Sequence, residues 1–327
     1  MTAGATFDCA LFDIDGVLVD IRKSYNEAIK KTVEFVLEQT GKGTKKSTGQ
    51  ATAVASAAVT DRLILRFRQS GGFNNDTDTS YAIALALMAN PQQSAAKARK
   101  FLEQVAENAD ETGIVSVEKF LAPYGIEKHK ELLAYPAPVN ESYIGRVFDE
   151  LFYGPGLFEK QNGSRPKYCR PKRPFIANDR LVVSRKTMEA LRQTLGDRLA
   201  IVSGRSRLAA EYSLRPVWKY FNLDACVFLE DEPREHAKPN PYAVKRAMSA
   251  TGARTAVYAG DSAEDMMMAR RAQKEAGYDI AFVGIYGFSP QPALTVRQFK
   301  EQGADAVARD VNALPKLLLN LNKVKPA

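Results

Sequence analysis

Short apolar runs alternate with helical patterns at the beginning of the chain and throughout its second half. Residues 7–12 form a mostly apolar run that ends at Asp13, which is typical of a buried strand in a parallel sheet. The other runs of strand length are residues 199–202, 226–229, 255–259, 280–285 and 306–308. Apolar residues at helical spacing lie between them, at residues 186–195, 241–250 and 263–276. This alternation predicts right-handed βαβ crossovers, and hence an α/β fold with a doubly wound, Rossmann-like parallel sheet covered on both faces.

The stretch between the first strand and the others has a different pattern, in which strand-like runs are hard to find. Apolar residues recur at helical spacing over residues 24–39, and Gly41 ends that pattern. Further helices are expected at residues 51–68, 81–89, 94–108, 117–121 and 143–151. We therefore predict a core formed by residues 1–20 and 178–327, interrupted by an inserted all-helical domain of residues 21–177.

The composition favours a folded protein of the cytoplasm. Of 327 residues, 45% are hydrophobic and 26% charged, which argues against wholesale disorder, collagen-like repeats or a coiled coil. No apolar run approaches the roughly 18 to 20 residues that span a bilayer, and residues 1–8 lack the pattern of a secretory signal, so no membrane role is expected. Cys9, Cys169 and Cys226 are widely spaced, which indicates neither a disulfide framework nor a zinc site.

The net charge of +8 suits an anionic small molecule or, as the weaker alternative, a nucleic acid. The nucleic-acid interpretation depends mainly on the basic, proline-broken stretch of residues 160–173. This cluster lacks the signature of an RRM, a KH domain or a helix-turn-helix motif, and a loop or linker explains it equally well.

Two carboxylates follow the first predicted strand. Asp13 and Asp15 form an Asp-x-Asp-Gly pattern, at the strand end where parallel sheets place their ligand crevice. A helix cap or an Asp-Gly turn is the alternative. Ser203 and Gly204 end the second strand with a hydroxyl and a flexible backbone, which suit a phosphate oxygen at a strand-to-helix junction.

Two further segments carry candidate chemistry. Lys238 stands in Ala-Lys-Pro-Asn-Pro, where prolines hold the backbone just before a helix, so its ammonium group is a candidate for binding an anion. An ordinary surface lysine is the alternative. Asp261 ends a later strand and Asp265 lies one helical turn further on, a pattern suited to a hard, oxygen-coordinated cation such as Mg²⁺.

In this order, the four segments resemble the signatures of the haloacid dehalogenase superfamily of phosphohydrolases: Asp-x-Asp after strand one, Ser or Thr after strand two, a Lys, and Gly-Asp-x-x-x-Asp. The helical insertion directly after the first motif resembles the mobile cap of subfamily I, although such caps are commonly smaller. The resemblance implies that Asp13 is a nucleophile that forms an aspartyl-phosphate. It implies that Asp15 protonates the leaving alkoxide and then activates water.

The resemblance also implies the ligands of a Mg²⁺ cofactor and of the phosphoryl group. Mg²⁺ would be held by the Asp13 carboxylate, the Asp15 backbone carbonyl and Asp261. The remaining phosphoryl oxygens would be held by Ser203, the amide of Gly204 and Lys238. For Asp265 two roles stay open, which are orienting Lys238 or a metal-bound water, and direct ligation.

The carboxylate of Asp15 reduces the number of activities that the resemblance implies. Dehalogenases and phosphonatases of this superfamily lack a carboxylate two residues after the nucleophile, whereas phosphatases and phosphomutases keep it. We expect a Mg²⁺-dependent phosphatase acting on a small phosphorylated metabolite. A phosphomutase of the β-phosphoglucomutase type is the closest alternative, because transfer to a second sugar hydroxyl uses the same residues. A non-catalytic or nucleic-acid-binding module is the alternative of a different class.

Candidate residues for substrate recognition are fewer. Residues 71–76 (Gly-Gly-Phe-Asn-Asn-Asp) form a polar stretch between predicted helices, and similar segments occur in caps of one subgroup of these hydrolases. The hypothesis is that Asn74, Asn75 or Asp76 faces the substrate, and a Gly-Gly helix end followed by a helix start is the alternative. Arg205 is a candidate partner for a substrate carboxylate or second phosphate, with a surface salt bridge as its alternative.

Overall fold

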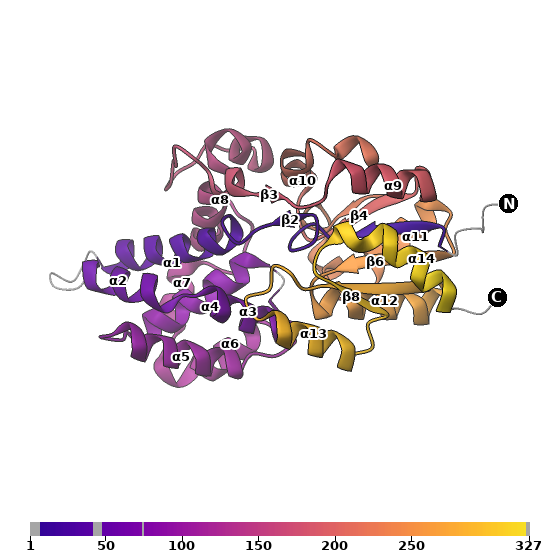
Figure 1. Ribbon diagram of the computed structural model, residues 1–327. Coiled ribbons are helices and arrows are strands. Elements are labelled where there is room, and N and C mark those ends of the chain that lie inside the picture. The colour runs from indigo at the N-terminus through magenta and orange to yellow at the C-terminus, as the bar shows by residue number, and fades with distance from the viewer. Residues whose placement is uncertain (1–6, 42–47, 74, 325–327) are drawn as a thin grey trace. The chain divides into compact units, whose positions relative to one another are not determined.

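The computed structural model describes residues 7–41, 48–73 and 75–324 (Figure 1). The chain forms two compact units, each described by itself below. The core unit comprises Met1–Ile21 and Asp179–Ala327, and the helical unit comprises Arg22–Asn178. The chain therefore leaves the core unit after residue 21 and re-enters it at residue 179.

The core unit is built on a six-stranded sheet with the order β5-β4-β1-β6-β7-β8, in which every neighbouring pair is parallel. Its strands are β1 (Cys9–Phe12), β4 (Leu199–Ser203), β5 (Val227–Phe228), β6 (Thr255–Gly260), β7 (Asp279–Ile285) and β8 (Ala306–Ala308). In β1, Ala10 pairs with Leu199 on one side and with Val257 on the other. All four side chains of β1 are fully buried, as a strand covered on both faces requires.

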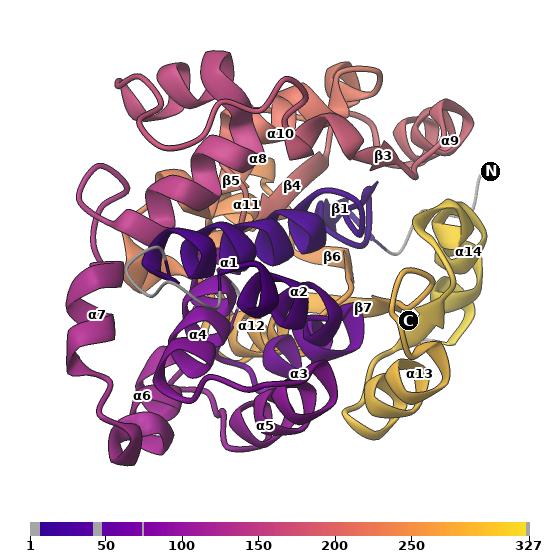
Figure 2. The same ribbon diagram turned by 90° about the vertical axis from the view of Figure 1, so that its left-hand side faces the viewer.

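Helices cover both faces of this sheet. They are α9 (Arg185–Leu195), α10 (Arg207–Leu214), α11 (Tyr242–Thr251), α12 (Ala263–Ala276), α13 (Pro292–Glu301) and α14 (Leu314–Val324). Helix α11 packs against β1, β4 and β5, and it also contacts α12, which packs on β6 and β7. Figure 2 shows α9 and α14 on the other side of the sheet. The predicted α/β fold with a doubly wound parallel sheet is confirmed.

A short antiparallel ribbon stands beside the main sheet. It pairs β2 (Val19–Asp20) with β3 (Arg180–Leu181), so it joins the chain segments that leave and re-enter the core unit. The side chains of Arg180 and Asp20 form an ion pair across it, with an N–O distance of 2.9 Å. The hydrophobic pattern did not predict these strands, because two residues are too few to show a period.

The described part of the helical unit consists of α-helices and short 3₁₀ turns, without a strand. The helices are α1 (Tyr25–Gly41), α2 (Thr48–Ala58), α3 (Asp61–Gln69), α4 (Asp76–Ala89), α5 (Ala95–Glu107), α6 (Ile114–Leu121), α7 (Glu127–Leu133) and α8 (Tyr143–Asn162). Helix α1 packs against α2, α4 and α8. The residues from Thr77 to Leu87 in α4 are all buried, so α4 lies in the interior of this unit.

Two of the expected helices differ from the structure. The single helix expected over residues 51–68 is wrong, because the chain forms α2 and α3 there. The Thr60 side chain begins α3 by accepting a hydrogen bond from the backbone N–H of Leu63. The helix expected at residues 143–151 continues to Asn162. The helix bends at Gly154, whose φ of +67° is a left-handed value that glycine adopts without strain, and Pro155 is the next residue.

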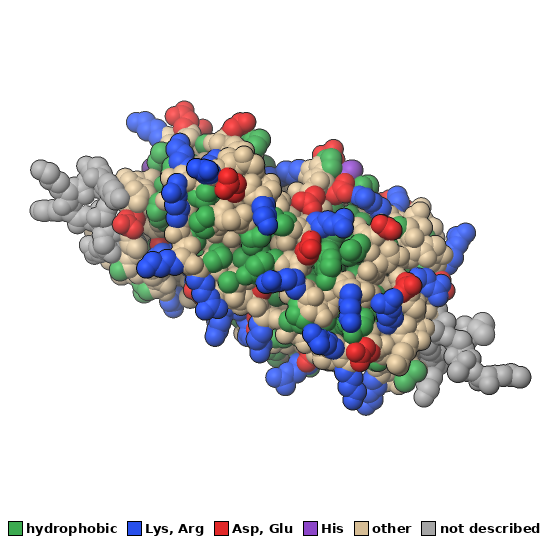
Figure 3. All heavy atoms as spheres, turned by 90° about the horizontal axis from the view of Figure 1, so that it is seen from above, with side chains coloured by type: hydrophobic (Ala, Val, Ile, Leu, Met, Phe, Trp, Pro, Cys, Tyr) green, Lys and Arg blue, Asp and Glu red, His purple; other side chains and the backbone are tan. Residues whose placement is uncertain are grey.

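The basic stretch of residues 160–173 includes an ordered loop after α8. Glu150 is fully buried, and its carboxylate accepts hydrogen bonds from the backbone N–H groups of Lys167, Tyr168 and Cys169 at 2.6 to 2.7 Å. The Arg146 guanidinium donates to Glu150 at 2.9 Å and to the carbonyl of Arg165 at 2.6 Å. On the molecular face seen in Figure 3, Lys and Arg side chains are intermixed with Asp and Glu.

None of the helices in the described part of the chain combines the length and apolar character that crossing a membrane demands. The three cysteine thiols are buried and unpaired: Cys9, Cys169 and Cys226.

Candidate active site

The loop that follows β1 carries the first two candidate carboxylates. Asp13 continues directly from β1, its backbone N–H donates to the carbonyl of Ala259 at 3.0 Å, and the residue is 4% exposed. The carbonyl of Ile14 then accepts hydrogen bonds from the backbone N–H groups of residues 17, 18 and 19. This closed turn holds Asp15 at a fixed place between β1 and the β2–β3 ribbon.

Glycine is required at residue 16 for two reasons. Its φ of +73° lies in the left-handed region. A Cβ atom at Gly16 would also stand 1.9 Å from Oδ2 of Asp261. The turn after β1 and the residue after β6 are therefore in close contact, and this places Asp261 beside the loop that carries Asp13 and Asp15.

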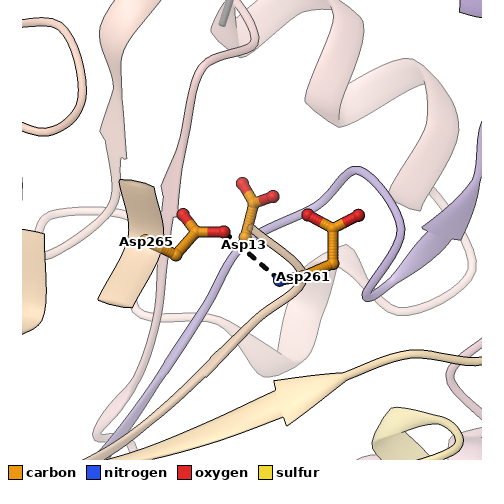
Figure 4. Close-up of side chains that lie close together, drawn as sticks. All are labelled: Asp13, Asp261 and Asp265. Atoms are coloured by element: carbon orange, nitrogen blue, oxygen red, sulfur yellow. Dashed lines mark hydrogen bonds between the residues drawn. The ribbon is translucent and has the colours of Figure 1, made fainter. Parts of the chain in front are cut away.

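Asp265 lies in the first turn of helix α12, and its carboxylate accepts hydrogen bonds from several donors. Ser262 and Asp265 form a capping box, in which the Ser262 side chain accepts from the Asp265 N–H and the Asp265 carboxylate accepts from the Ser262 N–H. Oδ2 of Asp265 also accepts from the Asp261 N–H at 3.2 Å, as the dashed line in Figure 4 shows. Oδ1 accepts from the Tyr258 hydroxyl at 2.8 Å and lies 2.6 Å from Nζ of Lys238. Asp265 is fully buried, and both of its oxygens are occupied by donors from the protein.

Lys238 joins the two acidic segments. Its Nζ lies 2.9 Å from Asp13 and 2.6 Å from Asp265, and its side chain is 7% exposed. Burial alone would lower the pKa of Lys238, but the charges of Asp13 and Asp265 outweigh burial and raise it. Lys238 is therefore a buried cation, and the alternative of an ordinary surface lysine is wrong.

Asp13 has a perturbed acidity. Burial raises the pKa of its carboxyl from 3.8 to about 7, the Lys238 ammonium opposes that shift, and the charge of Asp265 adds to it. A second cation beside Asp13 would favour the ionised carboxylate that nucleophilic attack requires.

The end of β4 supplies a hydroxyl and an open backbone. Ser203 is 1% exposed, whereas Gly204 is exposed and a Cβ atom there would meet nothing within 4 Å. The backbone at Gly204 is thus open to a ligand, as a residue that offers its amide to a phosphate oxygen must be.

Arg205 is placed differently from the surface salt bridge considered above. It is 1% exposed, because its guanidinium lies inside the core unit. Nε donates to Oδ1 of Asp15 at 2.6 Å, and Nη1 donates to Oδ2 of Asp179 at 2.6 Å. A surface ion pair is therefore wrong for this residue, and its contact with substrate stays a prediction.

The donor set fits a divalent cation. Asp13, Asp261 and Asp265 each offer a carboxylate oxygen, and these oxygens lie within 4.8 Å of one another. Because both oxygens of Asp265 are occupied, Asp13 and Asp261 are the better ligands of the three. The neighbourhood holds five carboxylates and two cationic side chains, so its charge is negative when all are ionised. They are Asp13, Asp15, Asp179, Asp261 and Asp265 with Lys238 and Arg205.

The other residues expected to recognise substrate belong to the helical unit. Asn75 caps α4, because its side chain accepts from the Thr77 N–H at 2.8 Å. Asp76 pairs with Arg68 at 2.7 Å. Asn74 lies outside the described residues. These contacts favour the helix-start alternative, and the hypothesis of a substrate contact stays a prediction.

Sequence reasoning missed three side chains of this neighbourhood. Asp179 and Ser213 bind Arg205, and Tyr258 binds Asp265. Asp179 follows the helical unit in the sequence with no periodic pattern around it, and Ser213 is one of several polar residues in α10. Tyr258 stands in an apolar run, where an aromatic residue suggests packing only.

Comparison with known proteins identifies the family of the chain and supports its fold. A family model of haloacid dehalogenase-like hydrolases matches residues 7–273. An X-ray structure of a Northeast Structural Genomics Consortium target is 16% identical, with a TM-score of 0.62 over 97% of this chain and 99% of that chain. The crystal structure of a predicted phosphoglycolate phosphatase from Haemophilus somnus is 15% identical, with a TM-score of 0.51 over 95% of this chain and 97% of that chain. At this identity the likeness concerns the fold. No curated protein matches the chain.

Proposed function

This chain belongs to the haloacid dehalogenase-like hydrolase family, and from that premise we propose that it is a Mg²⁺-dependent phosphatase of a small phosphorylated metabolite. The observation that carries the proposal is the cluster at the carboxyl ends of β1 and β6. In that cluster Lys238 bridges Asp13 and Asp265, and Asp261 lies against the loop after β1.

The first step transfers the phosphoryl group to the protein. An Oδ atom of Asp13 attacks phosphorus, and the bond from phosphorus to the leaving alkoxide breaks, which leaves an aspartyl-phosphate. Lys238, the Ser203 hydroxyl and the Gly204 amide neutralise the phosphoryl oxygens during the transfer. Burial of Asp13 and Lys238 supports this role, because charges interact more strongly where water is excluded.

Asp15 moves the protons. Its carboxyl gives a proton to the leaving alkoxide, and its carboxylate then takes a proton from the water that attacks the aspartyl-phosphate. The second step releases inorganic phosphate and restores Asp13. The exposure of Asp15 supports this role, since 26% of its side chain reaches solvent, against 6% for Asp13.

Asp13, the backbone carbonyl of Asp15 and Asp261 would hold the metal. A bound Mg²⁺ supplies charge neutralisation for the phosphoryl group and for Asp13. Asp265 acts through Lys238, because both of its oxygens already bind donors of the protein.

The two units have separate roles in this proposal. Residues 1–20 and 178–327 form the catalytic core, and residues 21–177 form a cap of the subfamily I type that selects the substrate, with Asn75 and Asp76 as candidate contacts. Three buried, unpaired cysteines suit a reducing compartment and support a cytoplasmic location.

Phosphate release from a panel of phosphorylated metabolites tests the proposal. Wild-type protein and Asp13→Asn are assayed with Mg²⁺ or with EDTA. The control is Asp224→Asn, the same change on an exposed turn before β5. We expect release that requires Mg²⁺, that Asp13→Asn lowers by at least about 10³-fold, and that the control leaves unchanged.

A failure of this assay has a defined meaning. Absence of release on every monoester would reject the phosphatase. Conversion of a hexose 1-phosphate to its 6-phosphate without net release would instead favour the phosphomutase, and salt-sensitive oligonucleotide binding would favour a nucleic-acid-binding module.

A further inference from the structure

A network of buried side chains contacts Asp15 in the core unit. Arg205 is at its centre, with a side chain that is 0% exposed. The guanidinium contacts Asp15 on one edge and Asp179 on another, and the Asp179 side chain is only 4% exposed. A guanidinium buried this fully is costly unless carboxylates surround it, so the two aspartates account for its place in the interior.

The contacts to Asp15 restrict the rotation of its carboxylate. Nε and Nη2 of Arg205 both lie near Oδ1 of Asp15, at 2.6 and 2.5 Å. The hydrogen bond from Nε and the ion-pair contact of Nη2 fall on the same oxygen, and together they fix the distance and the direction from which the guanidinium approaches it.

The far edge of the guanidinium is held in turn by a closed triangle. Nη1 donates to Oδ2 of Asp179 at 2.6 Å and to Oγ of Ser213 at 2.9 Å, and the Ser213 hydroxyl donates to Oδ2 of Asp179 at 2.5 Å. Arg205 therefore cannot swing away from Asp15 without breaking buried hydrogen bonds to Asp179 and Ser213.

The network also joins distant parts of the chain. Asp15 lies shortly before the chain leaves the core unit, and Asp179 is the residue at which it re-enters. Arg205 belongs to the segment between β4 and α10. Three segments, which are up to 190 residues apart in the sequence, therefore meet at the guanidinium of Arg205.

We propose that Arg205 and Asp179 are positioning residues, which hold the Asp15 carboxylate in the orientation that proton transfer to the leaving group requires. This inference depends on the proposed function and deepens it. A general acid displaced by a fraction of an ångström loses much of its effect, whereas nucleophilic attack by Asp13 does not use this network.

Leaving groups of different basicity separate positioning from a general structural role. A dinitrophenolate leaves without a proton, but an alkoxide needs one. We would measure kcat and KM for 2,4-dinitrophenyl phosphate and for glycerol 2-phosphate, or a faster alkyl monoester from the panel. The variants are Arg205→Met and Asp179→Asn, with Asp15→Asn as the reference.

The expected result is selective. Arg205→Met should lower kcat on the alkyl monoester by about 10²-fold or more and on the dinitrophenyl ester by less than about 10-fold, with KM little changed. Asp179→Asn should show the same selectivity for the alkyl monoester, with a smaller loss of kcat. The matched control is Arg207→Met, an exposed arginine two residues further on, which should affect neither ester.

Other outcomes overturn the inference. Equal losses on both esters would indicate a structural role only, and a raised KM with unchanged kcat would make Arg205 a substrate-binding residue. If Arg205→Met does not fold, Ser213→Ala and Asp179→Asn keep the test in force, and retention of full alkyl-ester activity in both would reject the network.

An inactive wild type would reject the proposed function and not this network. The network is then tested by thermal unfolding of Arg205→Met, Asp15→Asn and the double variant. Coupled residues should make the two shifts of Tm non-additive by at least about 3 °C, and additive shifts would overturn the proposal.

Discussion

Removing the ammonium of Lys238 should destabilise the core unit in a way that can be calculated from its surroundings. In Lys238→Met the carboxylates of Asp13 and Asp265 lose the cation between them, and both are buried. Methionine matches the length and apolar stem of lysine, so the change removes chiefly the charge and its hydrogen bonds.

Two estimates set the size of the effect. Two like charges within 4.8 Å of each other repel by about 3.5 kcal/mol or more at an effective dielectric constant of about 20, and breaking a buried ion pair costs about 3 to 5 kcal/mol. Protonation of Asp13 limits the loss. Taking its carboxyl from the ordinary pKa of 3.8 to the protonated state at about pH 7.5 costs about 5 kcal/mol, so an ionised Asp13 cannot cost the folded variant more than that value.

The upper limit on the energetic cost of an ionised Asp13 falls as the pH is lowered. Burial raises the pKa of the Asp13 carboxyl, so the folded variant takes up a proton more readily than the unfolded chain does. The penalty is therefore largest at neutral pH and is lost as the pH falls. At about pH 5.5 the same arithmetic limits it to about 2 kcal/mol.

Thermal unfolding followed by circular dichroism, in EDTA so that no metal replaces the ammonium, measures the loss. We expect Lys238→Met to lower Tm by about 10 °C at about pH 7.5, since 1 kcal/mol shifts Tm by about 2 to 4 °C in units of this size. Adding Asp13→Asn should restore about 3 kcal/mol. The matched control is Lys245→Met, because Lys245 is 42% exposed and its ion pair with Glu275 should contribute less than about 1 kcal/mol.

A loss in Lys238→Met no larger than in Lys245→Met would refute the reasoning. So would a penalty that grows as the pH falls, because protonation of a carboxyl can only relieve repulsion between two carboxylates.

Three further expectations follow from contacts described above. Gly16→Ala forces a Cβ atom against Asp261, so the Mg²⁺ affinity measured by calorimetry should fall at least about 10-fold. The control is Gly252→Ala, because Gly252 has a similar φ and open space around it, and this change should cost only about 1 kcal/mol of stability. Asp8→Asn should destabilise the protein slightly at neutral pH, because the backbone N–H of Arg254 lowers the pKa of Asp8, and in urea unfolding the deficit should shrink as the pH falls below the ordinary pKa of 3.8. Burial raises the pKa of all three cysteine thiols to about 11 or 12, so a disulfide reagent should label none rapidly in the native protein and all of them after unfolding.

The parallel sheet could be predicted because its strands are buried on both faces. Such strands are nearly continuous apolar runs, and those of β4, β6 and β7 stand out between polar helices. The break between α2 and α3 could not be predicted from periodicity, because it depends on one threonine whose side chain caps a helix. The ribbon of β2 and β3 is too short to show any period.

The candidate site divides in a similar way. Asp13, Asp261 and Asp265 stand at strand ends or at a helix start, and the ends of parallel strands meet at one edge, so their approach follows from topology. Burial of Arg205 could not be foreseen. An arginine is placed on the surface by default, and its transfer to the interior depends on Asp179, which is distant in sequence.

The central position of β1 has a consequence for the order of folding. Synthesis proceeds from the N-terminus, so β1 emerges before its partner strands β4 and β6, and its pairing with β6 extends to Ala259. The apolar face of β1 must therefore wait while about 250 residues are made, or roughly 12 to 50 s at ordinary rates of elongation. The helical unit is contiguous in sequence and has no such delay. During this interval β1 is an unpaired apolar strand, which is prone to associate with other chains. A circular permutant that begins after the helical unit would place β1 late in the chain and so shorten the time for which it is exposed.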